Sequence, residues 1–183
     1  MSEQHLLYSS YPISFEELSE AILAAGGETF SLEEMKAALS ASGHDPERWE
    51  DSEYTRLGQV KNGKAYVLIQ GSRHTENNPT RFWEENEPYI GAELLREITE
   101  KLSGKPVVSF SLEPGHASRS GLLAVELAYQ CAIRWPCVVW AEVFEDGNWV
   151  IKVYTREDME RLRAEGKAFT DYGMEDEDED VDE

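Results

Sequence analysis

Basic residues are scarce in this sequence. It has 183 residues, with 17 lysines and arginines against 37 aspartates and glutamates, which gives a formal net charge of −20. Eight of the last nine residues are acidic, and the rest of the chain still carries 29 acidic against 17 basic side chains. Such a charge repels DNA, RNA and anionic membranes and attracts basic proteins. The composition therefore predicts a basic protein as partner, with no nucleic acid and no membrane.

Cysteines, metal-binding motifs and long apolar runs are also few or missing. Cys131 and Cys137 are the only cysteines, and a lone pair at this spacing makes neither a disulfide framework nor a zinc signature. No His-Glu-x-x-His motif and no Asp-rich calcium loop occur. The N-terminus has no basic segment followed by an apolar core, and no apolar run approaches the ~20 residues that span a bilayer. We therefore expect a cytoplasmic protein without a metal or a cofactor.

Several helices are marked by their first residues. Ser14 with Glu17, and Ser31 with Glu34, form capping-box patterns. Apolar residues at helical spacing follow each box, and glycines end each run. A third amphipathic helix is expected over residues 90–102, where the apolar side chains again share one face.

Strands are expected in two hairpins and one buried segment. The first hairpin is centred on Lys61-Asn62-Gly63, because Asn-Gly favours a two-residue type I′ turn. A buried strand is expected at 106–112, and a second hairpin turns across residues 145–148. Thr155 then caps a last helix, which is mostly charged and is expected on the surface.

The helix expected over residues 118–134 is apolar nearly all round. Its only polar stripe is Glu126, Gln130 and Arg134, at successive i+4 positions. A helix of this kind packs on several sides, at the centre of a fold. Helices and hairpins occur without regular alternation, which predicts the α+β class: helices packed on antiparallel hairpins, around this central apolar helix. We expect the second half of the chain to supply the sheet.

The chain length suits a single domain with an acidic tail. We expect one α+β domain over residues 1–173, either undivided or with sub-lobes at 1–78 and 79–173. Residues 174–183 are expected to form a disordered acidic tail, because like charges repel one another and bury no apolar surface.

A strand–loop–helix junction suggests an anion site. In "PVVSFSLEPGHASRSGLLAVE" an apolar run leads through a loop to Arg119-Ser120-Gly121, where a helix begins. This stretch resembles the signature loop of the cysteine-dependent protein tyrosine phosphatases, in which a strand delivers the nucleophilic cysteine and the loop ends in arginine, serine or threonine, and glycine. Gly115 falls where that family often has glycine. The nucleophile position holds Glu113, so we predict no catalytic residue and no phosphatase activity.

Three interpretations of this loop remain. Gly115, Ser118, Arg119 and Ser120 could hold an anion weakly at the helix N-terminus. Glu113 could instead form an internal ion pair with Arg119. The plainest interpretation is structural: Gly115 permits the turn, Ser118 caps the helix and Arg119 points to solvent.

The order of elements near the N-terminus resembles a winged helix. Two helices and a hairpin over residues 14–70 would suggest DNA binding. However, residues 1–78 contain 13 acidic and 6 basic side chains, and the second helix carries Glu33 and Glu34 with a single Lys36. Because a recognition helix needs donors for phosphates and base edges, we expect no DNA binding.

In size, charge and lack of a catalytic constellation, the chain is similar to the immunity proteins and antitoxins that protect bacteria from nuclease-like toxins. This class-level resemblance implies an inhibitor that neutralises a basic protein, such as a toxin domain. The alternatives are a phosphate-binding or phosphoryl-handling protein that uses the 113–121 loop, and a general interaction module.

A binding surface for such a partner should combine carboxylates with an aromatic anchor. Two segments outside the periodic patterns have this composition, and they give the predicted surface: Trp49, Glu50, Asp51, Glu53, Trp83, Glu84, Glu85 and Glu87. The alternative is that each tryptophan packs its own loop onto the core. Trp135, Trp140 and Trp149 are expected to be structural, because they fall in the second hairpin and at a helix end.

Overall fold

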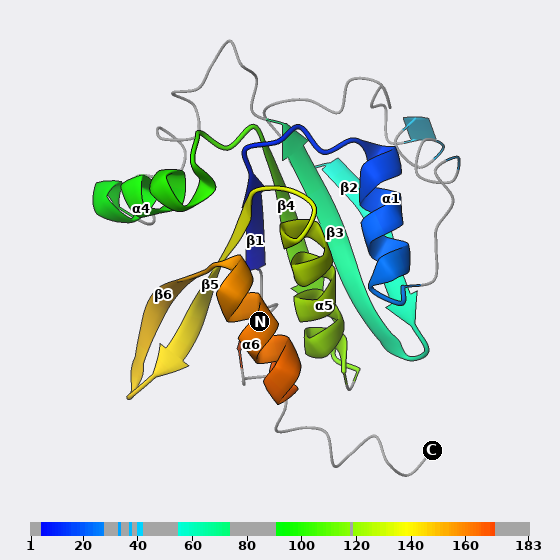
Figure 1. The fold of residues 1–183 in the computed structure, drawn as a ribbon. Coiled ribbons are helices and arrows are strands. Elements are labelled where there is room, and N and C mark those ends of the chain that lie inside the picture. Colours follow the sequence, from blue (N-terminus) through cyan, green and yellow to red (C-terminus); the bar gives the residue numbers. More distant parts are fainter. Residues whose placement is uncertain are drawn as a thin grey trace.

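A computed structural model describes residues 5–27, 55–73, 91–117 and 119–170, together with the single helical positions 33, 37, 40 and 41. The described elements are shown in Figure 1. In chain order they are β1 (His5–Ser9), α1 (Phe15–Ala24), β2 (Thr55–Asn62), β3 (Ala65–Arg73), α4 (Ala92–Leu102), β4 (Val108–Pro114), α5 (Ser120–Ala132), β5 (Cys137–Glu145), β6 (Asn148–Tyr154) and α6 (Arg156–Glu165).

The strands form one six-stranded sheet in the order β2-β3-β4-β1-β5-β6, and every neighbouring pair is antiparallel. The fold is therefore α+β, as the sequence predicts. The expectation that the second half alone supplies the sheet is wrong, because β1, β2 and β3 come from the first half. The β2–β3 hairpin is one edge of this common sheet, so it is not the separate wing of a winged helix.

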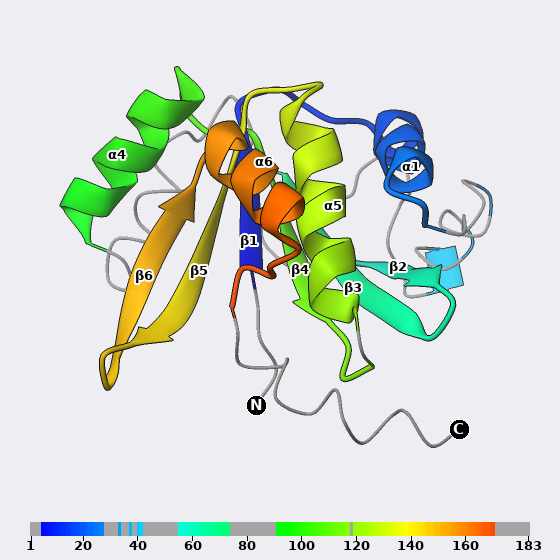
Figure 2. The same ribbon diagram turned by 60° about the horizontal axis from the view of Figure 1, so that its bottom comes forward.

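The main core lies on the sheet face covered by α1, α5 and α6 (Figure 2). Nine of the thirteen residues of α5 are buried, and this helix contacts α1, α6 and strands β3, β4 and β5. The central apolar helix is confirmed, although it begins at Ser120 and ends at Ala132. Below it, Phe110 and Val139 are among the buried strand residues of this core.

A second, smaller core lies on the opposite sheet face, under α4. Leu95, Ile98 and Leu102 of this helix pack with Tyr8 and Val138 of the sheet. The amphipathic helix predicted over 90–102 is thus confirmed, with its first helical residue at Ala92. Figure 2 shows α4 apart from the other helices, on the side of β5 and β6.

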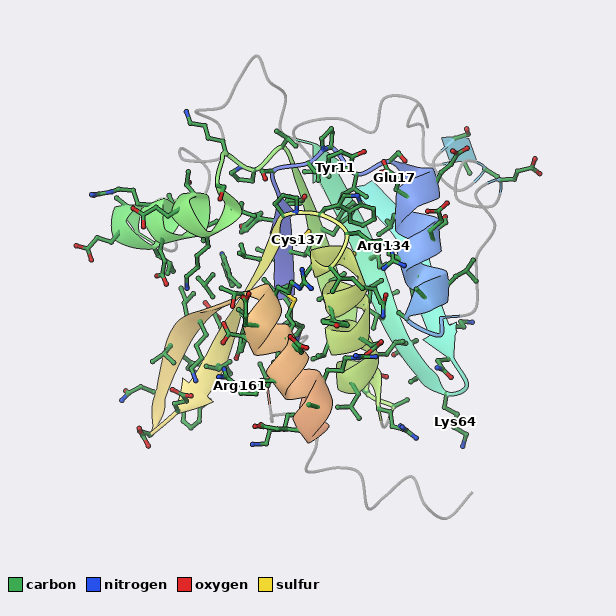
Figure 3. All side chains as sticks on the ribbon, in the orientation of Figure 1. Tyr11, Glu17, Lys64, Arg134, Cys137 and Arg161 are labelled. Atoms are coloured by element: carbon green, nitrogen blue, oxygen red, sulfur yellow. The ribbon has the colours of Figure 1, made fainter. Side chains whose placement is uncertain are left out.

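The helix caps predicted at Ser14 and Thr155 are confirmed, whereas the capping box predicted at Ser31 with Glu34 lies outside the described residues. At α1, the Ser14 hydroxyl accepts a hydrogen bond from the Glu17 N–H, and the Glu17 carboxylate accepts one from the Ser14 N–H. Thr155 and Asp158 form the same box at α6. Tyr11 donates its hydroxyl to Glu17 at 2.9 Å and stacks on Trp135; Figure 3 shows Tyr11 and Glu17 next to each other beside α1. Trp135 is therefore structural, as predicted.

The first hairpin turns one residue later than predicted. Asn62 pairs with Ala65, so the two-residue loop is Gly63-Lys64 instead of Asn62-Gly63. Gly63 has φ +61° and takes the first loop position, where a type II′ turn places glycine. The shift changes which residues pair across the hairpin, but it leaves Val60 and Val67 on the buried face of the sheet, as the predicted turn also would.

The predicted polar stripe of α5 joins this helix to α6. Gln130 donates to Glu126 at 3.1 Å, and Arg134 donates to both oxygens of Gln130 at 2.8 Å. Glu126 also accepts a hydrogen bond from Arg163 of α6, whose guanidinium lies over the Tyr129 ring. These contacts stabilise the packing of α5 against α6.

Within the described ranges, none of the helices has the length and apolar character needed to cross a bilayer.

Candidate protein-binding surface

The surface predicted from the sequence lies outside the described residues. This holds for all eight of its members, Trp49, Glu50, Asp51, Glu53, Trp83, Glu84, Glu85 and Glu87, and also for Ser118 and the acidic tail. Their roles stay predictions. Gly115, Arg119 and Ser120 of the 113–121 loop are described and can be placed.

Gly115 and Ser120 pack against the start of β3. A Cβ atom on Gly115 would lie 2.1 Å from Cζ of Tyr66, so glycine is required here because an aromatic ring covers it. The Gly115 N–H donates to the Tyr66 carbonyl at 2.8 Å, and the Tyr66 N–H donates to the Ser120 hydroxyl at 3.0 Å. Ser120 is 1% exposed. Both residues thus hold the strand–helix junction to β3.

Arg119 is exposed and marks the beginning of α5 in a left-handed conformation, with φ +72°. Its side chain makes no capping hydrogen bond. No ion pair joins Glu113 and Arg119 in the part of the chain that the structure describes. Arg119 points to solvent, as the structural interpretation predicts, and the anion site itself stays a prediction.

Aromatic side chains are exposed at the β5–β6 hairpin. Phe144 is 56% exposed and Trp149 is 52% exposed. The expectation that Trp149 lies in a core hairpin is therefore wrong, because about half of its surface is exposed. Figure 1 shows the loop end of this hairpin projecting beyond the helices. Exposed apolar side chains gathered in one place mark surfaces that bind other molecules.

The hairpin loop determines which side chains share a face. Asp146 and Gly147 both have positive φ angles, as a type I′ turn requires, and Glu145 pairs with Asn148 across the loop. Side chains alternate along each strand. We call the following six residues, which lie on the α4 side of β5 and β6, the hairpin face: Trp140, Glu142, Phe144, Trp149, Ile151 and Val153.

The hairpin face is packed against the small core under α4 at one end and exposed at the other. Trp140, Ile151 and Val153 pack against the small core under α4. Phe144 and Trp149 lie outside that core and contact each other edge to face, with ring centroids 5.4 Å apart and planes at 63°. Such a pair presents both ring edges and ring faces to a ligand.

Glu142 is the charged member of the hairpin face. It is exposed, lies opposite Ile151, and has Trp140 and Phe144 as neighbours two residues away on the same strand. No described residue forms an ion pair with it. Glu145, in contrast, points to the other side of the sheet and pairs with Lys152.

The chemistry of this arrangement suits a cation. Aromatic ring faces attract Lys and Arg, with Arg the more frequent partner. A carboxylate binds a guanidinium through two parallel hydrogen bonds while the planar group stacks on a ring. The hairpin face offers both groups side by side. Among the described residues, no group of three or more His, Cys, Asp and Glu could hold a metal ion.

The sequence contains a signal for this surface that is easy to miss. In "WAEVF" a carboxylate alternates with aromatics, so Glu142 shares a face with Trp140 and Phe144. A charge on the apolar face of a strand indicates that this face is open. Whether Trp149 is covered depends on β6 lying at the sheet edge, and residue order alone does not reveal that.

No protein family, curated protein or solved structure matches the chain.

Proposed function

We propose that this chain is an acidic binding protein that neutralises a basic partner protein through its hairpin face, in the manner of immunity proteins and antitoxins. The observation that carries the proposal is the exposed Phe144–Trp149 pair beside Glu142. Glu142 forms no ion pair with any described residue. The formal charge of −20 supports the same choice of partner. A basic toxin domain is the partner class we propose, and the cytoplasm is the compartment, where Cys131 and Cys137 stay reduced as free thiols.

The two components of the surface have different roles in binding. The net negative charge accelerates encounter with a basic protein and opposes acidic competitors. The aromatic pair supplies the contact that slows dissociation, because large rings bury much apolar area at little cost in conformational entropy. The charge alone would give fast but short-lived association.

A defined basic peptide tests the proposal. The probe is an octapeptide in which Arg and Val alternate, titrated into the full chain and followed by NMR chemical shifts. A Glu/Val octapeptide is the charge-reversed control. We expect the Arg/Val peptide to shift the signals of the hairpin face, and Trp149→Ala to weaken its binding by about tenfold, roughly 1.4 kcal/mol.

A matched control variant uses Leu23 of α1. Leu23 is 56% exposed and lies on the helix layer at the opposite sheet face, so Leu23→Ala removes a similarly exposed apolar side chain elsewhere. This variant should bind as the wild type does. Equal binding by both variants, or equal binding of the acidic and basic peptides, would contradict the proposal.

A further inference from the structure

The outer side of β6 is the second feature of the hairpin. In a two-residue hairpin, the residues that flank the loop exchange both backbone hydrogen bonds, and pairs alternate from there. Glu145 and Asn148 flank the loop, so the pairs of Ile151 and Val153 with β5 are the non-bonded ones. The N–H and C=O groups of Ile151 and Val153 therefore point away from β5. Within the described residues, no strand lies beyond β6.

The two edges of the sheet differ in how they are protected. Edge strands are commonly shielded from further pairing by bulges, prolines or short length. At the other edge, β2 has an irregularity between Arg56 and Gly58. In contrast, β6 pairs in continuous register over seven residues and contains no proline. This leaves β6 as a regular template for another strand.

The charge of the chain indicates what kind of strand would pair there. A second copy would bring another −20 charge and another Glu142 to the same edge. A basic segment meets no such repulsion. A strand added outside β6 lies two spacings of about 4.8 Å from β5, and an arginine on that strand can span this gap together with Glu142, each side chain reaching toward the other. An arginine on the hairpin face would thus pass over Ile151 and meet Glu142.

We propose that the basic partner binds by adding an extended segment as a seventh strand outside β6, with its arginines over the hairpin face. This inference rests on the proposed function and adds the mode of binding. Backbone hydrogen bonds to Ile151 and Val153 would supply affinity that is independent of side-chain sequence. Alternate side chains of the segment would supply specificity.

Amide hydrogen exchange of the full chain tests this mode with the same Arg/Val octapeptide. At saturation, exchange at the Ile151 and Val153 amides should slow by at least about tenfold. The Val150 and Lys152 amides already bond to β5 and should change little. Protection at all four amides, or at none, would overturn strand addition.

A pair of variants provides an independent measurement. Ile151→Pro removes the outward N–H, which an edge strand tolerates, whereas Ile151→Ala removes the side chain and keeps that N–H. Peptide affinity should be at least about tenfold lower for the proline variant than for the alanine variant. Equal affinities of two folded variants would overturn the inference.

The proposed function and its mode can fail separately. If Trp149→Ala weakens peptide binding while the Ile151 and Val153 amides gain no protection, strand addition fails and the proposed function stands. If neither measurement responds, both fail. A dimer of the chain alone, detected by sedimentation, with protected Ile151 and Val153 amides would overturn the choice of a basic segment as occupant.

Discussion

Truncation of Trp149 to alanine should destabilise the fold only moderately. A fully buried aromatic side chain costs about 3–5 kcal/mol when it is cut to alanine. Trp149 is 52% exposed, so about half of that cost, roughly 2 kcal/mol, remains. The edge-to-face contact with Phe144 accounts for roughly 0.5–1.5 kcal/mol of it. For a chain of this length the melting temperature should fall by roughly 4–8 °C.

Urea unfolding followed by far-UV circular dichroism measures this loss. Two reference variants define the scale: Leu23→Ala removes a side chain that is 56% exposed, and Phe110→Ala removes one that is 1% exposed. The Trp149 variant should lie between them, with an unchanged denaturant slope. A loss as large as that of Phe110→Ala would show that Trp149 is a core residue, and the binding surface would then be refuted.

Three further results are expected. Ser120→Ala leaves the Tyr66 N–H without the buried hydroxyl that accepts its hydrogen bond, so urea unfolding should show a loss of about 1–3 kcal/mol, and an unchanged stability would contradict the structural role. Burial opposes ionisation of Asp158, but hydrogen bonds from the Thr155 N–H and hydroxyl outweigh it and hold its pKa below the usual 3.8. The stabilisation that the Asp158 carboxylate provides is therefore present above pH 3.8 and is lost as the pH falls through its lower pKa in the folded state. Below pH 3.8 the free energy of unfolding should then fall less steeply for Asp158→Asn than for the wild type, and equal slopes would contradict this. Burial also raises the thiol pKa values of Cys131 and Cys137, the latter to about 12. A disulfide reagent should therefore label both thiols slowly in the native chain and quickly in urea, and rapid labelling of the native chain would contradict their burial.

Local signals explain which parts of the fold are predictable from sequence. The capping box at Ser14 involves residues three apart, and the apolar run of α5 is continuous, so each is visible in a short window. The Asp146-Gly147 turn likewise determines its own hairpin. These features form through neighbouring residues and are preserved in the structure.

Long-range features are not visible in such windows. Strand β1 has five residues and no polar–apolar alternation, because Leu7 faces the main core and Tyr8 faces the small core under α4. Its place between β4 and β5 depends on pairing with residues about a hundred or more positions away. The exposure of Trp149 has the same origin, since it follows from β6 being the last strand of the sheet.

The most direct measurement of the central claim compares two single-charge variants. Glu142→Gln and Glu20→Gln each remove one exposed carboxylate, the first on the hairpin face and the second on α1. Titration with the Arg/Val octapeptide at low salt should show about tenfold weaker binding for Glu142→Gln and near wild-type binding for Glu20→Gln. Equal losses for the two variants would mean that only net charge attracts the peptide, and this would contradict the hairpin face as a binding site.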